Sequence, residues 1–135
     1  MTEQVVLAAR PKRRSFPGRP DQVARARDFT RRTLGSCPVI EEAVLLVSEL
    51  VTNALEHTAT GLGGRFDVTV RGGESSVMIA VTDNGSDKVP VCGALDPEDV
   101  TGRGLGLVEF IAERWGHCGS RHGRTVWFEL RWTRP

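Results

Sequence analysis

Two residues of one predicted helix, Glu49 and Asn53, are of types that could act on a phosphate or a hydroxyl. They are four residues apart in a segment with helical periodicity, so they share one helix face. An acid and an amide placed in this way can hold a water, a hydroxyl or a hydrated cation between them. Asn53 could ligate Mg²⁺ through its side-chain oxygen, and Glu49 could accept a proton from an attacking hydroxyl or water. The alternative is a polar helix face turned to solvent, which is common.

A second candidate segment is Asp83-Asn84-Gly85, which follows a run of alternating apolar residues typical of a strand. Asp83 would then stand at the mouth of the sheet, where its carboxylate can accept a hydrogen bond from an exocyclic amine such as that of adenine. Gly85 would let the ring approach. The same three residue types also favour a plain turn.

A third segment, Gly102-Arg103-Gly104-Leu105-Gly106, opens a predicted helix. Its glycines expose backbone N–H groups, a helix N-terminus attracts phosphate, and Arg103 adds a fixed positive charge. The segment is neither a dinucleotide-binding pattern, since no parallel βαβ unit precedes it, nor a P-loop, since no Gly-Lys-Ser/Thr follows. A flexible glycine hinge is the alternative. Near the end of the chain, the hydroxyl of Thr125 could also reach a phosphate, although threonine is simply a good strand former.

The elements that must position these segments follow a β-α-α-β-β-loop-α-β-β order. Apolar periodicity predicts helices at 21–34, with Asp21 as the cap, at 39–57, and from about Gly104 with Leu107, Val108, Ile111, Ala112 and Trp115 inward. Strands are expected near 14–16, 66–70, 77–82, 116–121 and 124–132. Strands that cluster in hairpins predict an α+β fold, a two-layer sandwich of a mainly antiparallel sheet with three helices on one face.

The length of 135 residues favours a single domain. We expect residues 1–13 to form a flexible basic tail and residues 14–135 to form the domain. Residues 1–32 hold nine Arg or Lys and three acids, whereas residues 33–135 hold nine and fourteen. The basic cluster could meet nucleic acid or an acidic partner, but a frayed, solvated terminus is the plainer interpretation. No aromatic residue interleaves the cluster, so direct nucleic-acid binding is not expected.

The apolar runs of the chain are short. None approaches the roughly 18 residues of a membrane span, and no apolar stretch follows the charges at the N-terminus as in a signal peptide. The sequence therefore predicts a cytoplasmic protein that does not act at a membrane.

The order of the motifs resembles that of the GHKL (Bergerat-fold) ATPases. Within that superfamily the chain is most similar to the stand-alone anti-sigma-factor serine/threonine kinases, from about Arg14 to Trp132. The four segments that carry the resemblance are Glu49–His57 for the N-box, Asp83–Gly85 and Gly102–Leu107 for the two glycine boxes, and Gly123–Phe128 for the closing strand. Each box alone is weak, but four in this order and spacing are specific.

The resemblance implies ATP and Mg²⁺ as cofactors and a role for each matching residue. Asn53 would help hold Mg²⁺, Glu49 would be the general base, and Asp83 would bind the adenine amine beside Gly85. The backbone at Gly104, Leu105 and Gly106 would wrap the phosphates with charge from Arg103, Thr125 would hydrogen-bond near the nucleotide, and residues 84–101 would be the ATP lid. The implied substrate is a Ser or Thr of a small antagonist (anti-anti-sigma) protein. The implied binding partner is a sigma factor, with the kinase as a homodimer.

The chain departs from the family pattern at the first glycine box. Relatives often carry a second glycine two residues after the first, whereas Gly85 is followed by Ser86 and Asp87. An acid close to the phosphates could reduce nucleotide affinity. This leaves a second hypothesis open, a non-catalytic module that binds ATP or ADP weakly and works by sequestering a partner.

Overall fold

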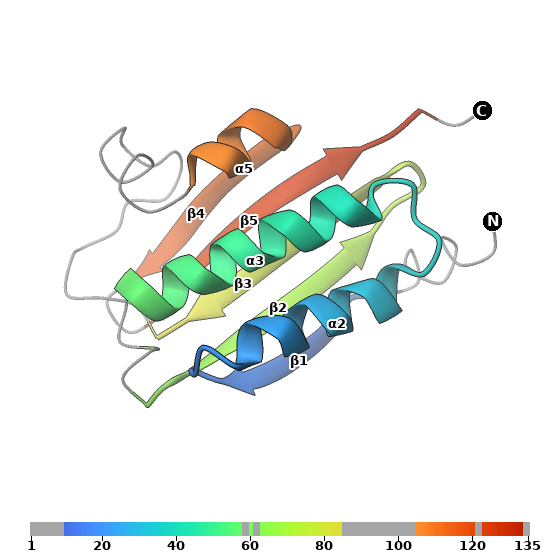
Figure 1. Ribbon diagram of the computed structural model, residues 1–135. Helices are drawn as coiled ribbons and strands as arrows, with labels where there is room; N and C mark the ends of the chain where they lie inside the picture. The colour runs from blue at the N-terminus through green and yellow to red at the C-terminus, as the bar shows by residue number, and fades with distance from the viewer. Residues whose placement is uncertain (1–9, 58–59, 61–62, 85–104, 121–122, 134–135) are drawn as a thin grey trace.

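The computed structural model describes residues 10–57, 60, 63–84, 105–120 and 123–133. Within these residues, a five-stranded sheet in the order β1-β2-β3-β5-β4 carries three helices on one face (Figure 1). The strands are β1 (Lys12–Pro17), β2 (Arg65–Gly72), β3 (Ser76–Asp83), β4 (Arg114–Ser120) and β5 (Gly123–Arg131), and the helices are α2 (Gln22–Leu34), α3 (Ile40–His57) and α5 (Gly106–Ile111). All neighbouring strands are antiparallel. The predicted α+β sandwich is confirmed.

The core lies between the sheet and the helices, because each strand turns alternate residues toward them. In β3 these residues are Val77, Ile79 and Val81, all at most 1% exposed. The matching residues of β2 and β5 are Phe66, Val68, Val70, Val126, Phe128 and Leu130. The apolar side of α3 covers the middle of this layer, packing against β3 and α2 (Figure 1).

Helix α2 has the predicted extent, but its predicted N-cap is wrong in detail. Asp21 occupies the N-cap position with helical backbone angles and makes no side-chain capping hydrogen bond. Its carboxylate instead accepts a bond from Arg19 at 3.3 Å, because helical φ and ψ turn the side chain away from the N–H groups of the first turn. At the other end Gly35 has φ 62°, a conformation that favours glycine, and its N–H donates to the carbonyl of Arg31 at 3.0 Å.

The first strand begins at Lys12, two residues before the predicted start, so Lys12 and Arg13 belong to the sheet and not to a tail. The burial pattern explains the error, since only Phe16 of this edge strand is buried and no alternation marks the strand in the sequence. Pairing with β2 places Arg13 opposite Thr69, two residues along the strand from Asp67, to which its guanidinium donates. Residues 1–9 of the predicted tail lie outside the described residues.

The third helix is shorter than predicted. It ends at Ile111, and Ala112 is already extended, so Trp115 lies in β4 opposite Phe128. The N–H of Glu113 donates to the carbonyl of Glu129 at 2.8 Å, which shows that pairing with β5 replaces the helix from this point. Trp115 still packs against the core, as the periodicity required, but it does so from a strand.

No helix in the described ranges is long and apolar enough to cross a membrane. The predicted lid at 84–101 falls outside them apart from Asn84.

Candidate nucleotide site

Three polar residues from distant parts of the chain meet at one end of the covered face. Asn53 comes from α3, Asp83 ends β3, and Arg124 lies in register with Asp83 at the start of β5. Their exposed fractions are 2%, 6% and 5%. Asn53 is therefore buried, whereas Glu42 and Glu56 of the same polar stripe are exposed. Buried polar side chains of this kind need partners within the protein or from a ligand.

The guanidinium of Arg124 joins the other two side chains. Its Nη2 donates to Oδ1 of Asn53 at 3.3 Å, and its Nε lies 3.9 Å from Oδ2 of Asp83. The second separation is within ion-pair range but too long for a hydrogen bond. Because both charged side chains are at most 6% exposed, each compensates the other in an environment that would penalise an isolated charge.

The residue that follows Asp83 is anchored by two hydrogen bonds. The N–H of Asn84 donates to Oγ1 of Thr60 at 2.8 Å, and its Oδ1 accepts from the N–H of Arg65 at 2.7 Å. Gly64 permits this approach, since a Cβ there would stand 1.8 Å from Oδ1 of Asn84. Asn84 thus has the structural role that its turn-forming type predicts, because it anchors the chain directly after the end of β3.

Glu49 lies one helical turn before Asn53 on the same side of α3 and is half-buried. By contrast Glu42, further along the same polar stripe, is exposed. The exposure of the polar side chains therefore falls between Glu42 and Glu49. Glu49 thus lies at the edge of the buried polar group, one helical turn from Asn53 and partly exposed.

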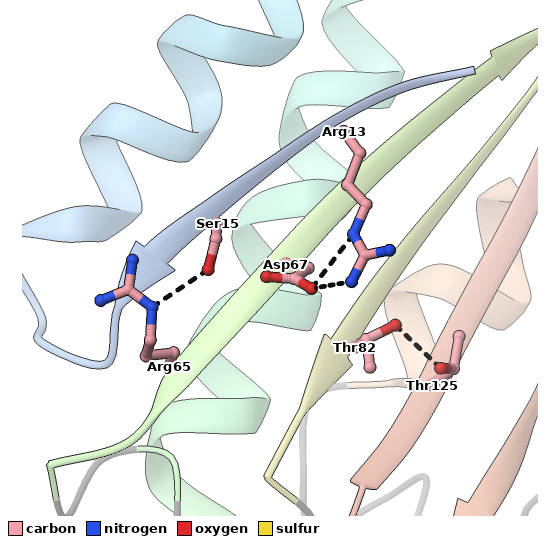
Figure 2. A network of polar contacts seen from close by, with 6 residues as sticks. All are labelled: Arg13, Ser15, Arg65, Asp67, Thr82 and Thr125. Carbon is pink, nitrogen blue, oxygen red and sulfur yellow. Dashed lines mark hydrogen bonds and ion pairs between the residues drawn. The ribbon is translucent and has the colours of Figure 1, made fainter. Parts of the chain in front are cut away.

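The structure does not bring Thr125 to this group. Thr125 pairs in register with Thr82, and the two hydroxyls are 2.8 Å apart on the face of the sheet away from the helices (Figure 2). The reason is the period of two along a strand, because Val126 faces the core and so does Arg124, while Thr125 between them faces the other way.

The open face, which is the face of the sheet away from the helices, carries further polar contacts that reach the edge strand β1. Figure 2 shows Arg13 donating to Asp67, with the Nε distance 3.2 Å, and Nε of Arg65 donating to Oγ of Ser15 at 3.1 Å. Burial alone would raise the pKa of Asp67. The hydrogen bonds from Arg13 and Ser15, with the charges of Arg13 and Arg65, outweigh it and lower the pKa of Asp67 below its usual value.

Of the second glycine box, only Leu105 and the residues after it are among the described residues. Leu105 is 1% exposed and packs in the core, and α5 begins at Gly106. The other predicted site residues, Gly85, Arg103 and Gly104, lie outside the described residues.

A family model described as a histidine kinase-like ATPase domain matches residues 16–130. The chain belongs to the histidine kinase-like ATPase family. This membership places it among the GHKL ATPases and implies that it binds ATP, so the buried group at the end of the sheet is the candidate nucleotide site of an ATPase domain.

A solved structure shares the fold of this ATPase domain. It is the crystal structure of the RsbU and RsbW domains of Rv1364c from Mycobacterium tuberculosis, with a TM-score of 0.70 and 21% sequence identity. The match covers 94% of this chain but only 34% of the other, so the chain spans about a third of that protein. No curated protein is significantly similar to the ATPase domain in sequence.

The residues of the ATPase domain fit Mg²⁺ held together with a nucleotide. Mg²⁺ prefers oxygen ligands and is usually held by one or two protein groups, substrate phosphates and water. Oδ1 of Asn53 is a buried oxygen of this kind, and it also accepts a hydrogen bond from Arg124. Across the described ranges, no group of three or more His, Cys, Asp or Glu could hold a metal without such help.

Arg124 is the site residue that sequence reasoning missed. The signal was present, since Val126, Phe128 and Leu130 alternate as core residues and the same alternation puts Arg124 on the covered face. The residue types alone point instead to the hydroxyl of the neighbouring Thr125, because a hydroxyl can bond to a nucleotide. Counting strand positions back from Phe128 would have selected the arginine.

Proposed function

We propose that this ATPase domain is an ATP-dependent protein serine/threonine kinase that acts as an anti-sigma regulator. It would transfer the γ-phosphate of ATP to a Ser or Thr of a small antagonist protein and also bind a sigma factor, in the cytoplasm and as a homodimer. Family membership and the resemblance of four motifs to the anti-sigma kinases support the proposal. The observation that carries it is the burial of Asn53 beside Asp83, with Glu49 at the edge of the same group.

The proposed chemistry assigns one task to each of these side chains. Asp83 would accept a hydrogen bond from the adenine amine, and Asn53 would place Mg²⁺, which neutralises charge on the phosphates when bound. Gly85, Gly104, Leu105 and Gly106 with Arg103 would contribute the phosphate-binding backbone and charge that the resemblance assigns to them.

Phosphoryl transfer forms a bond between the substrate hydroxyl oxygen and the γ-phosphorus and breaks the bond between that phosphorus and the bridging oxygen of ADP. The hydroxyl proton passes to the carboxylate of Glu49. Because such transfer depends mainly on positioning and charge stabilisation, a half-buried carboxylate at the edge of the site is well suited to this role.

Replacing Glu49 with Ala tests the proposal. We expect ATP affinity to stay within about twofold, while phosphate transfer to the antagonist protein falls at least about a hundredfold, as loss of a general base predicts. Glu42→Ala is the matched control, because Glu42 lies on the same stripe of α3 but is exposed. Transfer is measured with γ-labelled ATP and candidate antagonist proteins, and affinity by calorimetry with and without Mg²⁺.

Full transfer by the Glu49→Ala variant would remove Glu49 from the mechanism. If the wild type binds ATP yet phosphorylates none of the antagonist proteins, the sequestering module that Ser86 and Asp87 suggest becomes the better description.

A further inference from the structure

The most unusual atom of the buried group is Nε of Arg124. It is buried and has no hydrogen-bond partner among the described residues. The N–H groups of a guanidinium donate hydrogen bonds and accept none, so this atom can only be a donor. A buried donor without an acceptor is unfavourable, and an acceptor group of a ligand placed beside it would remove that cost.

The direction of this donor is fixed by its surroundings. Nη2 is held by Oδ1 of Asn53 at 3.3 Å, and the guanidinium is planar, so Nε cannot turn independently. The carboxylate of Asp83 lies beside it, with 3.9 Å between Nε and Oδ2. The site thus presents a donor and an acceptor side by side, both buried and both held by the ends of paired strands.

We propose that Arg124 and Asp83 together select adenine, with Nε of Arg124 donating to ring nitrogen N1 while Asp83 accepts from the 6-amino group. This inference rests on the proposed nucleotide site and adds a specificity-determining residue to it. Adenine carries an acceptor next to a donor on this edge and so complements the pair. Hypoxanthine, with a 6-oxygen acceptor and an N1–H donor, presents the reverse order and would set its oxygen against the carboxylate.

The test compares ligands that differ by one group, measured by calorimetry on the whole chain. These are ATP, 1-deaza-ATP (which has C–H in place of N1) and purine riboside triphosphate (which lacks the 6-amino group). Wild type should bind 1-deaza-ATP about tenfold more weakly than ATP, the usual effect of one lost hydrogen bond to a charged donor. Since this arm changes only the ligand, it does not depend on whether a variant folds.

The variant Arg124→Met then assigns the effect to the arginine, because Met keeps an unbranched side chain but donates nothing. We expect it to bind ATP and 1-deaza-ATP equally, and to discriminate against purine riboside triphosphate as wild type does. Arg124→Lys, which retains a donor, should recover part of the preference for ATP over 1-deaza-ATP.

The outcomes separate this inference from the proposed function. Wild type that binds ATP and 1-deaza-ATP equally, but loses affinity for purine riboside triphosphate, keeps the nucleotide site and overturns the role of Arg124. Tighter ATP binding by Arg124→Met also overturns it, and makes the arginine a competitor for Asp83. Absence of ATP binding in wild type overturns both.

Discussion

Two neighbouring cross-strand pairs, Asp83–Arg124 and Thr82–Thr125, lie on opposite faces of the same two strands. They differ by one position in sequence, yet the first pair is buried under the helices and the second is half-exposed on the open face. Asp83 and Arg124 form a charged pair that is shielded from water, whereas water can reach the two threonines. In these two strands, register therefore decides more than residue type which side chains lie in the buried group.

The largest expected difference between the two pairs is in stability. Arg124→Met leaves the buried carboxylate of Asp83 without its counter-charge and should lower the free energy of unfolding by about 3 kcal/mol. Thr125→Val removes one hydroxyl contact beside solvent and should cost less than about 1 kcal/mol. Urea unfolding followed by circular dichroism measures both values.

The double variant Arg124→Met/Asp83→Asn sharpens this result. It should be more stable than Arg124→Met alone, because the uncompensated charge is removed. Equal destabilisation by Arg124→Met and Thr125→Val would mean that the buried ion pair has no special energetic role.

The next largest expected difference between the two pairs is in nucleotide affinity. Asp83→Asn replaces a charged acceptor by a neutral amide and should weaken ATP binding by about 2 kcal/mol, roughly thirtyfold. Thr125→Val should leave affinity within about twofold, because its side chain points away from the group. Calorimetry with Mg-ATP measures both, and a large loss in Thr125→Val would restore the nucleotide contact expected from the sequence.

The smallest expected effect concerns the ion pair at the edge of the open face. The pKa of Asp67 is lowered in the folded protein, so its contribution to stability is present above its unfolded pKa of about 3.9 and is lost as pH falls through the folded value. Asp67→Asn should therefore cost about 0.5 kcal/mol at pH 7, since Arg13 is largely exposed. Unfolding titrations at pH 7 and pH 3 check the sign, and a difference that grows toward low pH would contradict it.

Much of the architecture followed from the sequence. Alternation in β2, β3 and β5 and the apolar periodicity of α3 were strong enough to locate these elements within about two residues. The errors fell where tertiary pairing replaces a local signal. β1 has one buried residue to mark it, and the end of α5 is set by the bond from Glu113 to Glu129 in β5.

The features of the candidate site also fall into two groups, those that the sequence indicated and those that only the tertiary structure revealed. Residue types and spacing alone selected Glu49, Asn53 and Asp83, because acids, amides and turn residues in that order carry chemical meaning. The burial of Asn53 and the entry of Arg124 between it and Asp83 were decided by the packing of α3 against strands that are distant in sequence. The sequence by itself thus determined which chemical groups are present and in what order along the chain. The tertiary structure alone decided which face each group occupies and which charge it must compensate, because burial and strand register are properties of the assembled sheet and helices.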